Sequence, residues 1–70
     1  QSKKYPGIVI EFKVINPRKE SLLEETVEAA LKQIEEKNYD AELINRGVDK
    51  ENIHHYGFAF KGKEVLIDGR

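Results

Sequence analysis

The chain has 70 residues, which is the size of one small domain with a single core. Its 12 Lys and Arg residues nearly balance 13 Asp and Glu residues, which disfavours a protein that holds nucleic acid by bulk positive charge. The absence of cysteine excludes disulfides, thiolate metal ligands and cysteine nucleophiles. No apolar run approaches the roughly 20 residues of a membrane span, and no signal peptide is evident. We therefore expect a cytoplasmic protein without a membrane partner.

A nearly continuous apolar run predicts the first strand at residues 8–15. Its Val, Ile and Phe content indicates a strand covered on both faces, and Pro17 ends it because proline has no N–H for a ladder. Apolar residues at helical spacing then predict an amphipathic helix over residues 21–37. Ser21 and Glu24 have the spacing of a capping box at its start.

The second half of the chain predicts a short helix and two more strands. Asp40 has the position of an N-cap for a helix over residues 40–46. Strand composition returns at residues 53–60, and the turn at 61–63 leads into a last strand at 64–68. A strand, a crossover helix and a second strand normally pair in parallel, whereas a hairpin pairs antiparallel. The expected fold is an α/β domain with a three-stranded mixed sheet.

The strand at residues 53–60 has two unlike faces. Gly57 and Ala59 share one face, and such small residues let the long helix approach closely. Tyr56 and Phe58 share the other face, which is bulky and is expected to cover a different surface.

A charged pair interrupts the first apolar strand. Glu11 and Lys13 are two residues apart, so they project from one face of the strand together with Val9 and Ile15. Charged side chains that are taken out of water must be paired or bound to a metal. Charged residues within an otherwise apolar strand are therefore typical of a functional site. Alternatively, this face is a solvent face with both side chains hydrated, although Val9 and Ile15 count against that interpretation.

The segment IVIEFK at residues 8–13 resembles the (D/E)xK strand of the PD-(D/E)XK nuclease superfamily. The similarity extends to EAALKQI at residues 28–34, YGFAF at 56–60 and GKEV at 62–65. Over residues 5–68 this ordered set resembles the C-terminal nuclease-like domain found behind AAA-ATPase-like domains in many bacterial proteins. The resemblance implies that the sheet is part of a restriction-endonuclease-like core, with an AAA-ATPase-like domain in the parent protein.

The resemblance also implies a Mg²⁺-dependent phosphodiesterase that acts on nucleic acid. By position, Glu11 would be a metal ligand, since Mg²⁺ prefers hard oxygen ligands. Lys13 would orient or help deprotonate the attacking water, or stabilise charge on the scissile phosphate. Gln33 would contact the active site or a phosphate from the helix, the alternative being an exposed polar residue of that helix.

The second metal ligand of the superfamily, an Asp on a preceding strand, has no counterpart at residues 1–7. Asp40, Asp49 and Asp68 all follow the first strand, so none matches that position. We therefore expect a single nuclease-like domain that lacks the upstream Asp-bearing strands, with weak Mg²⁺ binding and no efficient cleavage. The alternative is a non-catalytic binding or self-association module of the same fold.

The strand at residues 8–15 is expected to leave one sheet edge open, because only two strands follow it. Open edges pair with other chains, and a small domain gains stability by burying more surface. We therefore predict a homodimer formed near this strand, through the open sheet edge.

Overall fold

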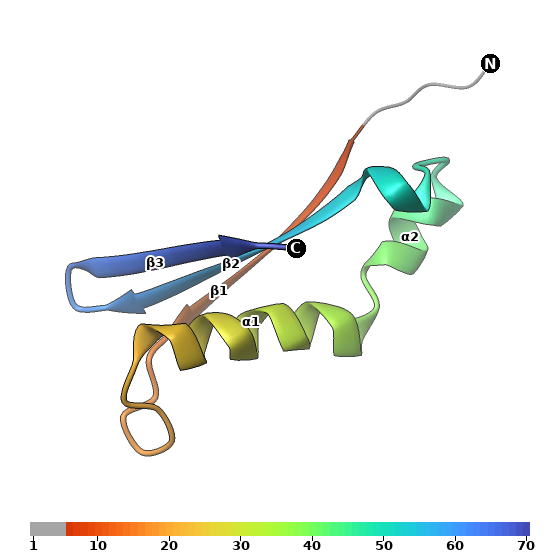
Figure 1. The fold of residues 1–70 in the computed structure, drawn as a ribbon. Coiled ribbons are helices and arrows are strands. Elements are labelled where there is room, and N and C mark those ends of the chain that lie inside the picture. Colours follow the sequence, from red (N-terminus) through yellow and green to blue (C-terminus); the bar gives the residue numbers. More distant parts are fainter. Residues whose placement is uncertain (1–5) are drawn as a thin grey trace.

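The structure, a computed structural model, describes residues 6–70 and contains one sheet (Figure 1). Its strands are β1 (Gly7–Val14), β2 (Ile53–Lys61) and β3 (Glu64–Gly69), in the order β1-β2-β3, and a 3-10 turn at Lys50–Asn52 precedes β2. β1 and β2 pair in parallel, and β2 and β3 pair antiparallel. The predicted mixed three-stranded α/β fold is therefore confirmed, and each strand boundary lies within one residue of its prediction.

Helix α1 (Leu23–Lys37) begins two residues later than the sequence pattern predicts. The predicted capping box is wrong in register, because Leu22 is the N-cap and Glu25, not Glu24, folds back over the first turn. The Glu25 carboxylate accepts hydrogen bonds from the backbone N–H groups of Ser21 and Leu22, at 2.8 and 3.0 Å. These bonds favour the ionised form, so they lower the pKa of Glu25 below its usual value of 4.5.

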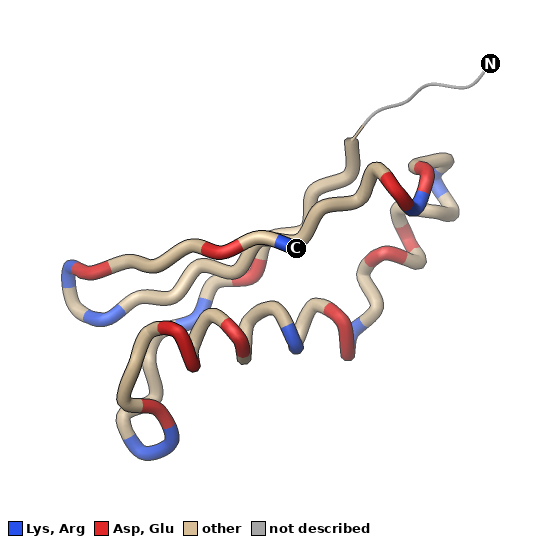
Figure 2. The backbone as a smooth tube through the Cα atoms, viewed as in Figure 1, with Lys and Arg blue, Asp and Glu red and all other residues tan. Residues whose placement is uncertain are grey.

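Helix α1 ends at Asn38, whose left-handed backbone (φ 50°) turns the chain toward α2 (Asp40–Asn45). The short helix is confirmed, but its N-cap is Tyr39 rather than Asp40. Five glutamates and two lysines lie along α1, with acidic residues at its start and a lysine near its middle and at its end (Figure 2). Neither helix of the described chain is long and apolar enough to cross a membrane.

The core lies between α1 and one face of the sheet. Its buried apolar residues are Val9, Val27, Ala30, Leu31, Ile34 and Ala59. A Cβ atom at Gly57 would lie 3.1 Å from the carbonyl oxygen of Val27 and 3.2 Å from the Ala30 Cβ. The predicted close approach of the helix to this strand is therefore confirmed, and it depends on the missing side chain of Gly57.

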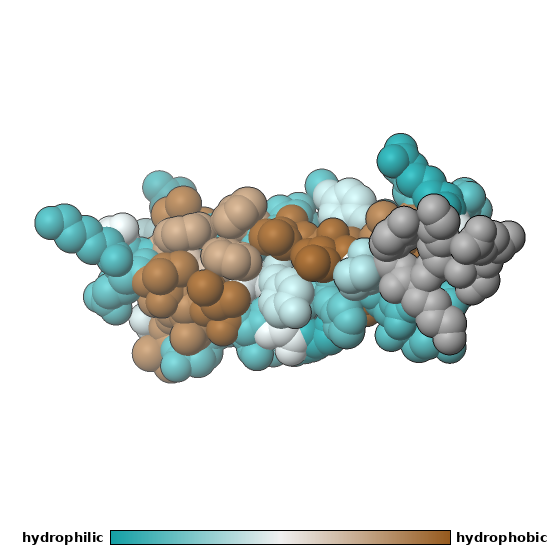
Figure 3. Space-filling view, turned by 90° about the horizontal axis from the view of Figure 1, so that it is seen from above, coloured by the Kyte–Doolittle hydropathy of each residue, from teal (hydrophilic) through white to brown (hydrophobic). Residues whose placement is uncertain are grey.

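The other face of the sheet, here called the open face, is not covered by any element within residues 6–70. The expectation that the first strand is covered on both faces is wrong for this part of the chain. The register brings together on this face Ile8, Ile10, Phe12, Val14, Tyr56, Phe58, Phe60, Val65 and Ile67. Seen from above, hydrophobic side chains cover much of it (Figure 3). This face stays uncovered because both described helices lie on the opposite side of the sheet. There, α1 and Leu43 of α2 pack against the face that carries Val9.

Candidate functional site

Glu11 and Gln33 come from different elements and meet on the helix-covered face of the sheet. Gln33 Nε2 donates a hydrogen bond to Glu11 Oε2 at 3.1 Å, and both side chains are half-buried. The two residues are 22 positions apart in the sequence, so it is the packing of α1 on β1 that joins them. The structure thus brings together two of the three predicted site residues, while their roles remain predictions.

Lys13 lies on the same face of β1 as Glu11 and is also half-buried. In the sheet register it stands beside Ala59 of β2, whose small side chain leaves space for the lysine stem. Its ammonium group takes part in none of the ion pairs among residues 6–70. The interpretation of this face as a solvent face does not hold, because α1 covers it and Lys13 is half-buried.

A cavity of about 380 Å³ lies where β1 meets α2, at the edge of β1 that pairs with no strand of residues 6–70. Its lining residues are Ile8, Val9, Ile10, Glu11, Tyr39, Glu42, Leu43 and Arg46. Arg46 makes a long ion pair of 3.9 Å with Glu42 one helical turn away, and both side chains are exposed. Glu11 and Arg46 therefore line the same cavity, whereas Lys13 does not line it.

The carboxylates of the described chain do not fit a complete magnesium site. Within residues 6–70, no group of three or more His, Asp and Glu side chains lies close enough to hold a metal ion. Glu11 already accepts a hydrogen bond on one carboxylate oxygen, and Asp40 pairs with a histidine instead. Mg²⁺ can be held by one or two carboxylates when waters and substrate phosphates complete its shell. Glu11 therefore fits at most a weakly held, largely hydrated ion.

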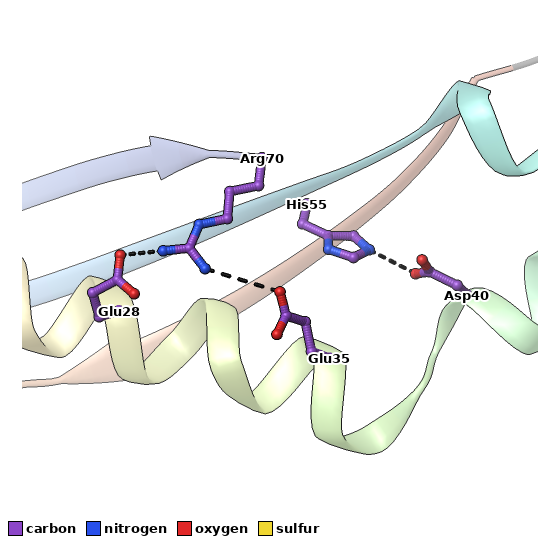
Figure 4. Close-up of polar contacts among 5 residues, drawn as sticks. All are labelled: Glu28, Glu35, Asp40, His55 and Arg70. Carbon is purple, nitrogen blue, oxygen red and sulfur yellow. Dashed lines mark hydrogen bonds and ion pairs between the residues drawn. The ribbon is translucent and has the colours of Figure 1, made fainter.

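Asp40 and His55 form a histidine–aspartate pair between the helices and the sheet (Figure 4). His55 Nε2 is 2.7 Å from Asp40 Oδ1, and both side chains are mostly buried. The contact ties the start of α2 to β2 and explains why Asp40 does not cap its own helix. Neighbouring His54 is exposed and belongs to the opposite face, so the adjacent histidines do not chelate one ion. Sequence reasoning missed this pair, because its members are separated by a helix and a turn.

A second polar cluster fastens the end of β3 to α1 (Figure 4). Arg70 donates a hydrogen bond to the carboxylate of Glu28, and its other terminal nitrogen lies 3.9 Å from Glu35. The bond to Glu28 raises the pKa of Arg70 above its usual value, so the guanidinium stays charged at any ordinary pH. This cluster lies on the exposed side of α1 and has a structural role.

The sequence of this chain matches the model of a known protein family. The family model described as the PD-(D/E)XK nuclease superfamily matches residues 1–69. Neither a curated protein nor a solved structure matches the sequence. The matched range covers almost the entire chain, and the observed parallel β1–β2 pair with its crossover helix α1 is consistent with such a core. The chain therefore belongs to the PD-(D/E)XK nuclease superfamily.

Proposed function

We propose that this chain is a nuclease-like domain in which Glu11, Lys13 and Gln33 form one end of a site for a phosphodiester of nucleic acid. The observation that carries the proposal is the hydrogen bond from Gln33 to Glu11 between α1 and β1. It fixes one carboxylate on a face where a partly buried lysine is the neighbouring charge.

Each side chain has a chemical role that follows from its type and position. The Gln33 amide orients the Glu11 carboxylate and leaves its other oxygen free to accept a proton or hydrogen bond from a water molecule. The Lys13 ammonium attracts a phosphate oxygen and stabilises negative charge that develops there, an effect that is stronger in a partly desolvated site. Arg46 in the adjoining cavity offers a further phosphate contact.

The magnesium dependence typical of the superfamily belongs to this proposal as well. A bound divalent ion would offset charge on the phosphate and make a hydroxide available. Because the described carboxylates are too few for a tight site, we expect the chain by itself to bind Mg²⁺ weakly and to cleave nucleic acid slowly. This is the behaviour of a fragment or remnant of a Mg²⁺-dependent phosphodiesterase. The resemblance to domains that follow AAA-ATPase-like domains supports an AAA-ATPase-like domain in the parent protein.

Binding of a fluorescent DNA oligonucleotide at low salt tests the proposal. Lys13→Ala should weaken binding about tenfold, whereas Lys61→Ala, an exposed lysine in the β2–β3 hairpin, should weaken it about twofold. Glu11→Gln removes a negative charge, so it should strengthen binding without Mg²⁺ and reduce the effect of adding Mg²⁺. Equal losses for the two lysine variants would show that only overall charge matters and would contradict the site. Cleavage that survives Lys13→Ala would indicate a contaminating nuclease.

A second candidate function, a non-catalytic binding or self-association module of the same fold, is favoured by the exposed apolar surface. The open face exposes several large apolar side chains to a partner, and within residues 6–70 the outer edge of β1 pairs with no other strand. This second function predicts that the chain associates strongly. It also predicts that Lys13→Ala weakens oligonucleotide binding no more than Lys61→Ala does, and that Mg²⁺ does not change the binding.

A further inference from the structure

The open face exposes far more apolar surface than a soluble domain normally leaves in water. In β1, the exposed fractions of Ile10, Phe12 and Val14 are 44%, 61% and 74%. In β3, Val65 and Ile67 are 50% and 52% exposed. The surface is continuous across the strands, since Phe12 packs on Phe58 and Phe60 of β2, with ring centroids 5.1 and 6.1 Å apart. It is therefore one patch and not a set of scattered side chains.

The patch has the size that one partner contributes to a stable interface. Ile8 and Tyr56 are 55% and 36% exposed as well. With them, the residues of the open face present roughly 700 Å² to solvent, which is close to the area buried per partner in a standard interface. The largest apolar patch of a typical monomer is about 300–600 Å². Hydrophobic burial of this surface is favourable in a domain whose own core consists of a few side chains of one helix and one sheet face.

The patch is also free of Asp, Glu, Lys and Arg. Its outward positions in β1, β2 and β3 are all aliphatic, aromatic or glycine, apart from His54 at one end. A two-fold interface brings the same surface of both copies together, so a charge at its centre would meet its own equivalent or be buried unpaired. The absence of charge makes the open face complementary to itself.

We propose that a second copy of this chain packs on the open face, sheet against sheet, around a two-fold axis. Sheets packed face to face lie about 10 Å apart with strands inclined by about 30°, which suits flat rows of Ile, Val and Phe. The Phe12–Phe58–Phe60 cluster supplies the aromatic anchor that such interfaces concentrate at their centre. This arrangement places the dimer on the face of β1 and not on its edge, and leaves the Glu11 side free for a ligand. The inference does not depend on the nuclease function.

Sedimentation equilibrium of the 70-residue chain from about 10 µM to 1 mM tests the proposal. The expected result is a monomer–dimer equilibrium that Ile67→Lys weakens by about tenfold or more, because a lysine is then buried in the interface. Ile44→Lys is the matched control, since Ile44 is 44% exposed but lies on α2, away from the open face. This control should change the dimer dissociation constant by less than about twofold.

A further variant separates packing on the face from pairing at the edge. Tyr56→Lys alters the central strand, which a partner strand added beside β1 does not touch, so it should weaken only a face-to-face dimer. Circular dichroism of each variant checks that it is folded. A folded wild-type monomer at 1 mM overturns the proposal, because the face is then left for a different partner. A dimer that tolerates both Ile67→Lys and Tyr56→Lys also overturns it, in favour of pairing along the β1 edge.

Discussion

The two faces of the sheet come from the same strands, yet they differ in packing, charge and expected role. On the helix-covered face, Val9 and Ala59 are buried and Gly57 admits the helix backbone. On the open face, Phe12 and Ile67 are more than half exposed. The charged residues of β1 lie on the covered face, where α1 holds one of them by a hydrogen bond. Packing of α1 therefore orients the side chain of Glu11 on the covered face. The more hydrophobic open face is left available for association.

The largest expected contrast between the faces is in stability. Ile34 is fully buried under the sheet, so Ile34→Ala should lower the free energy of unfolding by about 3 kcal/mol. Ile67→Ala on the open face makes the same chemical change but should cost about 1 kcal/mol or less in the monomer. Urea unfolding at low micromolar concentration measures both values. If Ile34→Ala abolishes folding, Ile34→Val should still cost about 1 kcal/mol. Equal costs for the two alanine variants would contradict the assignment of the core to one face.

Gly57 tests how tightly α1 approaches the covered face. Gly57→Val would put a side chain where even its Cβ lies 3.1 Å from the backbone oxygen of Val27. We expect a loss of about 2 kcal/mol in the free energy of unfolding, despite the higher strand propensity of valine. Phe58→Val, one position along the strand on the open face, is the matched control and should cost less. Stabilisation by Gly57→Val would mean that the helix lies farther from β2 than described.

The hydrogen bond between Gln33 and Glu11 should appear as a modest coupling energy. A double-mutant cycle with Glu11→Ala and Gln33→Ala should give about 1 kcal/mol, as is typical of a partly buried hydrogen bond. Equilibrium unfolding of the four proteins measures it. A cycle that pairs Glu11→Ala with Lys32→Ala provides the control, since Lys32 is exposed on α1 and should show no coupling with Glu11. Strictly additive losses at Glu11 and Gln33 would contradict the proposed orienting contact.

The smallest expected effect concerns the start of α1, away from both faces. The pKa of Glu25 is lowered in the folded chain, so the stabilisation that its charge contributes is present above about pH 4.5 and is lost as the pH falls below that value. The stability difference between wild type and Glu25→Gln should therefore shrink on acidification. Thermal unfolding between pH 7 and pH 3 measures it. A difference that grows on acidification would contradict the backbone contacts of Glu25.

Much of the fold could be predicted from local patterns, because strand composition, helical periodicity and the crossover rule all agree in this chain. The capping register was wrong because Ser21 with Glu24 and Leu22 with Glu25 have the same spacing, and the pattern cannot show which carboxylate reaches back. The apolar run of β1 predicts a strand covered on both faces, which is wrong within residues 6–70, because composition cannot show whether anything covers each side.

Only part of the candidate site could be predicted in the same way. Alternation along β1 placed Glu11 and Lys13 on one face, and the superfamily resemblance pointed to Gln33. The contact between Gln33 and Glu11 depends on how α1 lies across the sheet, which no local pattern encodes. The pair of His55 with Asp40 and the cavity beside α2 depend on tertiary packing in the same way.

The central claim, that Glu11, Lys13 and Gln33 act as one site, is tested most directly by nuclear magnetic resonance. An isotope-labelled chain is titrated with a short single-stranded DNA in the presence of Mg²⁺. We expect the largest shifts at the Gln33 side-chain amide and at the backbone amides of Glu11 and Lys13. Shifts confined to other surfaces, with the Gln33 side-chain amide unmoved at saturating DNA, would contradict it.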